Sequence, residues 1–156
     1  MFDQKVAEKH INGLVRRYKI KVIGYSVSSC GRAWPGSRKI KIPRPTNIDR
    51  FCVCLHEVKH IIDGLTGPSF KLEFDCDMYA MDEAKALGFD VSEWEKRTRW
   101  HSLSRIAMAM NRKMPARKIP DYIKEYFSDV DFSGWEGRKV FVSSDRKYKD
   151  IVITIN

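Results

Sequence analysis

The chain has 156 residues, 43% of them hydrophobic and 12% aromatic, and 29 Lys and Arg against 20 Asp and Glu give a net charge of +9. This length suits one compact domain, and no segment approaches the roughly 18 uninterrupted apolar residues of a membrane helix, which excludes a membrane-spanning protein. The N-terminal stretch contains acids and lacks the apolar run of a secretory signal, so we expect a soluble, cytoplasmic protein.

The first predicted element is an amphipathic helix over residues 3–18, with Asp3 as its N-cap. Its inward face is predicted to carry Val6, Leu14, Val15 and Tyr18. Residues 19–27 are rich in β-branched and aromatic side chains and predict a strand. After a stretch of turn-forming residues, isoleucines alternate with lysines over residues 39–43, as on a half-exposed strand.

Two consecutive helices are predicted next, over residues 47–65 and 70–87. Gly64 and Gly88 are natural stops for them. Apolar residues recur along the first of these helices with the spacing of a buried stripe. They are Phe51, Cys54, Leu55, Val58, Ile61, Ile62 and Leu65.

The remaining residues predict two more helices and a hairpin. Ser92 and Glu95 have the spacing of a capping box, which starts a long helix running toward Arg112. Pro120 begins a shorter helix over about 120–128. Two apolar runs around a polar turn predict a hairpin at 138–155.

These elements predict an α+β fold. A small N-terminal sheet would pack on the helices over residues 47–65 and 70–87, and further helices and a C-terminal β-hairpin would surround them. We expect a single domain over residues 1–156. Its core would span about 1–90, and a basic helical and hairpin extension would span about 91–156.

The positive charge is concentrated in the C-terminal third. Residues 1–95 carry a net charge of +2, whereas residues 96–156, with 14 basic and 7 acidic side chains, carry +7. Such a bias raises affinity for polyanions through counterion release, which makes nucleic acid a candidate partner of this third. The alternative is an ordinary solubilising surface charge.

The four cysteines form no CxxC pair and are too few to staple a chain that can build a core. We therefore expect reduced and mostly buried thiols at Cys30, Cys52, Cys54 and Cys76.

The chemistry-bearing motif is LHEVKH at residues 55–60. His56 and His60 stand four residues apart on a predicted helix, so both imidazoles project from one face and can meet one zinc ion. Glu57 is rotated off that line, where its carboxylate can act as a general base on a metal-activated water. The alternative is a helix with two partly exposed histidines and a solvated acid.

A catalytic zinc site usually has three protein ligands, so a third donor is needed. Glu73 on the next helix is the best candidate, because Asp77 follows one turn later and can hold the far nitrogen of a ligating histidine. Weaker rivals for the third position are Asp75, Asp82 and Glu83.

At these residues the sequence resembles the ImmA/IrrE-type zinc metallopeptidases, a branch of the zincins with a glutamate as third ligand, which implies a zincin-like fold. The resemblance covers residues 19–87 and rests on the strand RKIKIP, the helix with HEVKH and the helix with EFDCDMYA. It implies zinc held by His56, His60 and Glu73, Glu57 as the catalytic base, Asp77 as the histidine's partner, and hydrolysis of a specific intracellular protein. The sequence departs from the family at Lys59 and after the second helix, where MDEAKALGFDV stands.

Two other functions remain open from the sequence. A SprT-like protease acting on DNA-bound proteins also has an HExxH helix, but it uses a third histidine. A zinc-stabilised module could instead bind nucleic acid or protein without cleavage, through the basic stretch 99–118. The alternative for that stretch is a helix that buries Leu103, Ile106, Ala107 and Met110.

A donor for the oxyanion is the least defined part of the predicted site. By residue type alone, the candidates are His101, Tyr25 and Tyr79, and the spacing of Tyr79 favours a place in the core.

Overall fold

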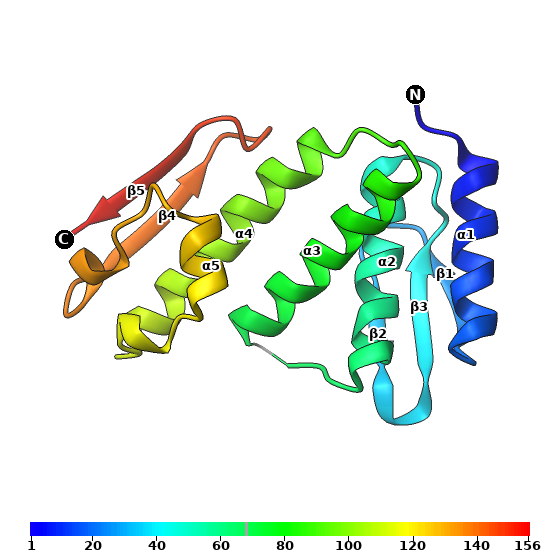
Figure 1. The fold of residues 1–156 in the computed structure, drawn as a ribbon, viewed down its shortest axis with the longest axis horizontal. Helices are drawn as coiled ribbons and strands as arrows, with labels where there is room; N and C mark the ends of the chain where they lie inside the picture. The colour runs from blue at the N-terminus through cyan, green and yellow to red at the C-terminus, as the bar shows by residue number, and fades with distance from the viewer. Residues whose placement is uncertain (68) are drawn as a thin grey trace. The chain divides into compact units, whose positions relative to one another are not determined.

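Five α-helices and two small sheets form in the computed structural model, which describes residues 1–67 and 69–156 (Figure 1). The α+β prediction is therefore confirmed. The chain divides into a first unit, Met1–Pro68 with Leu72–Glu95, and a second unit, Ser69–Lys71 with Lys96–Asn156.

Helix α1 (Gln4–Arg17) begins where the Asp3 carboxylate accepts hydrogen bonds from the backbone N–H groups of Lys5 and Val6. This is the predicted N-cap. The helix buries Ala7, Ile11 and Leu14. The prediction that Val6 faces inward is wrong, because its side chain is 39% exposed.

The first sheet has the order β1-β3-β2, with β1 (Lys21–Ser26) parallel and β2 (Arg32–Trp34) antiparallel to β3 (Lys39–Pro43). The predicted alternation in β3 is present, since Ile40 and Ile42 are buried and Lys41 is exposed. Strand β2 was not predicted, because it is short and lies in a stretch rich in turn-forming residues. The 3₁₀ turn η1 (Pro35–Ser37) connects it to β3.

Helix α2 (Ile48–Asp63) and most of helix α3 (Phe70–Ala86) also belong to the first unit. Asn47 caps α2 by accepting from the backbone N–H of Arg50, and Gly64 ends the helix in the left-handed conformation with φ 69°. The predicted stripe of α2 is buried from Phe51 to Ile61, but Leu65 lies beyond the helix and is 58% exposed. Phe51 packs in the core against the rings of Phe2 and Phe89.

The second unit contains most of α4 (Ser92–Asn111), α5 (Asp121–Tyr126) and the hairpin of β4 (Val140–Ser144) and β5 (Ile151–Ile155). Two short 3₁₀ turns, η2 (Ala116–Lys118) and η3 (Phe132–Trp135), lie between these elements. Their short length explains why the sequence did not reveal them. Helix α4 buries the four apolar residues predicted for it, which are Leu103, Ile106, Ala107 and Met110.

The cysteines are all free thiols, and three of the four are buried as predicted. Cys30 is the exception, because it lies on the exposed loop before β2. Within the described residues, no helix combines the length and the apolar character that crossing a bilayer requires.

Candidate metal centre

Helix α2 places His56 and His60 one turn apart, and their Nε2 atoms lie 3.1 Å from each other. The two imidazole rings meet edge to face, with centroids 4.9 Å apart. Both side chains are shielded from solvent, since His56 is 13% and His60 6% exposed. The i, i+4 spacing therefore produces the convergence that the motif predicted.

Each histidine is oriented through its other ring nitrogen. His56 Nδ1 lies 2.7 Å from Oδ1 of Asp77, and His60 Nδ1 lies 2.9 Å from the carbonyl oxygen of Leu65. A carbonyl oxygen or a carboxylate only accepts hydrogen bonds, so the hydrogen of each neutral ring resides on Nδ1. Both Nε2 atoms are then left as lone-pair donors that face the same point.

Glu73, in the first turn of α3, brings its carboxylate to these nitrogens. Its Oε2 lies 3.3 Å from His56 Nε2, and its Oε1 lies 3.4 Å from His60 Nε2. Asp77 stands one turn further along α3 and is 6% exposed. The structure thus brings together all four of the predicted residues His56, His60, Glu73 and Asp77.

Cys76 is a neighbour that sequence reasoning treated only as a small packing residue. Ligand atoms of His56, His60 and Cys76 lie within 4.8 Å of one another, so this group could hold a metal ion. The Cys76 sulfur lies 3.6 Å from His60 Nδ1, the nitrogen that faces Leu65. Burial raises the pKa of the Cys76 thiol, and the Glu73 carboxylate adds to the rise.

The surrounding carboxylates favour positive charge at His56. Burial alone lowers the pKa of His56, but the hydrogen bond to Asp77 and the contact with Glu73 raise it to about 10. Two acids around one imidazole stabilise a cation in this position, whether it is a proton or a metal ion.

Glu57 occupies the predicted place beside the histidines. It is 9% exposed, and burial raises the pKa of its carboxyl group above the usual range, although His56 and His60 oppose the rise. Gly31 lies directly against it. A Cβ atom at residue 31 would stand 2.4 Å from Glu57 Cγ and 2.9 Å from Oε1, so only glycine permits this close approach.

An open cleft of about 640 Å³ runs along these groups. Glu57, His60 and Glu73 line one part of the cleft. The segment from Gly31 to Ser37, which contains β2, lines another part. Within the described residues, β2 is hydrogen-bonded only to β3, so its outer edge is unpaired. Sequence reasoning missed both Gly31 and β2, and the glycine in SSCGRAW was the only local signal.

The other predicted candidates are not among the residues that line the cleft. Tyr25 lies beneath the Arg44 guanidinium and Tyr79 beneath the Lys59 ammonium, and neither tyrosine lines the cleft. His101 belongs to the second unit. Among the rival acids, Glu83 Oε2 lies 2.6 Å from His10 Nε2, and Asp82 is exposed.

Comparison with known proteins gives no further assignment: no family model matches the chain, and no curated protein or solved structure matches it.

Proposed function

We propose that the first unit is a zincin-like metallopeptidase of the ImmA/IrrE type, which holds one zinc ion through His56, His60 and Glu73. It would hydrolyse a peptide bond in a specific intracellular protein, with Glu57 as general base. The observation that carries the proposal is the convergence of three donor groups. Their separations of 3.1, 3.3 and 3.4 Å are close to the spacing of about 3.3–3.6 Å that follows from tetrahedral coordination at normal zinc–ligand distances.

Glu73 is a better third ligand than Cys76. The Glu73 carboxylate lies beside the Nε2 atoms, which have lone pairs available, whereas the Cys76 sulfur lies beside the His60 Nδ1 that donates to Leu65. A ligand set with two imidazoles and one carboxylate also suits zinc. The position of Glu73 favours this set over the SprT-type set with a third histidine.

A zinc ion bound there would supply Lewis acidity, which lowers the pKa of water toward neutrality. The protein's own contribution begins with Asp77, which holds the His56 ring through Nδ1 and directs Nε2 toward Glu73. Glu57 is suited to take a proton from the attacking water and deliver it to the leaving amine, because it lines the same cleft as Glu73 and burial raises the pKa of its carboxyl group.

The unpaired edge of β2 supports a peptide as the substrate. Backbone N–H and C=O groups of an edge strand can pair with an extended peptide, which would then lie in the same cleft as Glu57 and Glu73. This arrangement aligns a substrate backbone with the proposed base without requiring a deep pocket.

Metal stoichiometry by mass spectrometry tests the ligand set. We expect about one zinc per wild-type chain and per Asp82→Ala control, and clear loss in Glu73→Ala. Cys76→Ala should keep the metal. If Cys76→Ala loses zinc while Glu73→Ala retains it, the third ligand is the thiolate. A wild-type protein that takes up no zinc when zinc is supplied would contradict the whole proposal.

Hydrolysis is tested separately, with a library of unstructured peptides analysed by mass spectrometry. Glu57→Gln should lower the cleavage rate by about 10²–10⁴-fold and leave the zinc content unchanged. A zinc-loaded wild type that cleaves no peptide and no co-purifying protein would support the non-catalytic binding module instead.

A further inference from the structure

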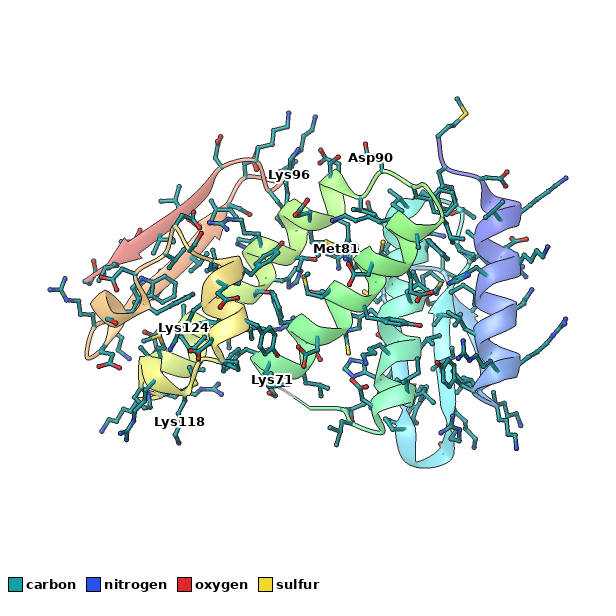
Figure 2. The ribbon with its side chains drawn as sticks, in the orientation of Figure 1. Lys71, Met81, Asp90, Lys96, Lys118 and Lys124 are labelled. Atoms are coloured by element: carbon teal, nitrogen blue, oxygen red, sulfur yellow. The ribbon has the colours of Figure 1, made fainter. Side chains whose placement is uncertain are left out.

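Six exposed basic residues gather in the second unit, drawn from three separate segments of the chain. Two follow the end of α4, two lie in η2, and two precede β4. They are Arg112, Lys113, Arg117, Lys118, Arg138 and Lys139. In Figure 2, nitrogen-tipped side chains extend from the ribbon near Lys118.

Hydrogen bonds between the segments hold this basic cluster together. The Asn111 side chain donates to the Val140 carbonyl and accepts from the Val140 N–H, both at 2.9 Å, which joins the end of α4 to the start of β4. The Ala116 N–H donates to the Glu136 carboxylate at 2.6 Å, which joins η2 to the segment before β4. The six basic residues are therefore near one another because of specific contacts.

The cluster contrasts with other charged residues of the same unit. Arg99 pairs with Asp129, and Lys124 lies 3.6 Å from Asp121. Within residues 1–67 and 69–156, none of the six residues of the basic cluster forms an ion pair. Glu136, the nearest acid in sequence, is engaged by a backbone N–H instead. Like charges gathered without partners repel one another, so their placement is better explained by an anionic partner than by stability.

An exposed aromatic ring lies next to the cluster. Phe141 is 57% exposed. Lys139 stands two residues earlier, just before β4, and its backbone pairs with that of Asn156 in continuation of the β4–β5 ladder, so the two side chains share one face of that ladder. Its cross-strand neighbour is Thr154, which is also exposed, so no large side chain stands opposite the ring. A phenyl ring beside cations is the combination that stacks a base while its phosphates are neutralised.

We propose that this surface of the second unit binds single-stranded nucleic acid. The basic cluster would contact backbone phosphates, and Phe141 would stack on a base. This function goes beyond the proposed peptidase activity and does not depend on it, because no residue of the surface belongs to the metal centre. Aromatic stacking distinguishes a single strand from a duplex, whose bases are already stacked.

The test is fluorescence anisotropy of the full chain with a labelled oligothymidine of about 20 nucleotides, measured over a series of salt concentrations. If all six cations meet phosphates, the slope of log K against log salt should be about −4. Neutralising four of them, in R112Q/K113Q/R117Q/K118Q, should reduce it to about −1.4. The control K5Q/K9Q/R16Q/R17Q removes the same charge from α1 and should keep the wild-type slope.

Phe141→Ala tests the stacking contact. It should weaken oligothymidine binding about tenfold without changing the salt slope, because the lost group is uncharged. Its circular dichroism spectrum should match that of the wild type, since the ring is largely exposed.

Three results would overturn the proposal. One is equal slopes in the two quadruple variants, because the cluster would then be no different from any other basic surface. Another is Phe141→Ala binding oligothymidine as tightly as the wild type, with duplex DNA bound as well as the single strand. The third is binding to phosphatidylserine vesicles but not to oligothymidine, which would identify an anionic membrane as the partner.

Discussion

The two units use charged side chains in opposite ways. In the first unit, Glu57 and Asp77 are buried, and the 15% exposed Glu73 side chain joins them around two histidines. In the second unit, the six residues of the basic cluster face solvent with no acidic partner among the described residues. A buried carboxylate is costly unless a positive charge compensates it, whereas an exposed cation is inexpensive and remains available to a partner.

This contrast shows why net charge alone does not reveal function. Residues 1–95 are nearly neutral, with a net charge of +2, yet Glu73 and Asp77 lie there against two histidines. The burial and the direction of each charge decide what it can bind. Four substitutions, taken from the largest expected effect to the smallest, test this difference between the units.

Gly31→Ala should have the largest effect, because the new Cβ would overlap Glu57. We expect peptide hydrolysis to fall about 100-fold, since a displacement of about 1 Å in a catalytic group is enough for such a loss. The zinc content should not change. Gly36→Ala in the same cleft is the control, because no atom lies within 4 Å of its added Cβ. Equal activity in the two variants would show that Gly31 does not position Glu57.

Asp77→Asn should weaken zinc binding about 10–100-fold, because a neutral amide oxygen is a weaker acceptor than the carboxylate that orients His56. Competition with a chelator of known affinity measures the change. Asp82→Asn changes an exposed acid of the same helix and should have no effect. If Asp77→Asn binds zinc as tightly as Asp82→Asn and the wild type, Asp77 does not support the zinc site through His56.

Asn111→Ala should destabilise the protein by about 1–3 kcal/mol, because the N–H and C=O of the buried Val140 would lose their partners. It should also weaken oligothymidine binding, since the end of α4 would no longer be held to β4. Urea unfolding and anisotropy measure the two effects. Asn12→Ala, on an exposed part of α1, is the control. If Asn111→Ala is destabilised but binds oligothymidine as tightly as the wild type, the contact between Asn111 and Val140 is not needed for binding by the basic cluster.

Asp129→Asn should have the smallest effect, below about 1 kcal/mol, because Asp129 is exposed and exposed ion pairs contribute little. The hydrogen bond from Arg99 lowers the pKa of Asp129. A lowered pKa in the folded state means that the contribution is present at neutral pH and disappears as the pH falls through that pKa. Urea unfolding at neutral and acidic pH measures the difference between Asp129→Asn and wild type. If Asp129→Asn lowers the free energy of unfolding by well above about 1 kcal/mol at neutral pH, this ion pair does not behave as an exposed one.

The predictable parts of the fold are those determined by neighbouring residues. The N-cap of α1 at Asp3 and the stop of α2 at Gly64 were readable, because each depends on backbone groups within four residues. Strand β2 was not readable, because its extended state depends on pairing with β3 in an otherwise turn-rich segment. The exposure of Cys30 and Leu65 also depends on how distant parts of the chain pack, so it could not be inferred from their apolar character.

The candidate site divides in the same manner. The positions of His56, Glu57 and His60 around their helix follow from helical spacing. The same spacing places Glu73 and Asp77 on one face of the next helix. The contact of Gly31 with Glu57 joins a loop to a helix across the fold, and no pattern in either segment predicts it. The proximity of Cys76 to His60 was missed because small residues in a helix are read as packing residues.

The sequence by itself determined most of the helical faces, the N-cap of α1 and the two pairs of site residues, because these depend on periodicity and hydrogen bonds over a few residues. It also determined that the C-terminal third is basic. Only the tertiary structure decided that Glu73 meets both histidines, that β2 borders the cleft, and that the three segments carrying six cations lie close together. Those relations depend on long-range packing and hydrogen bonds, in which the partner of each residue lies far away in the chain.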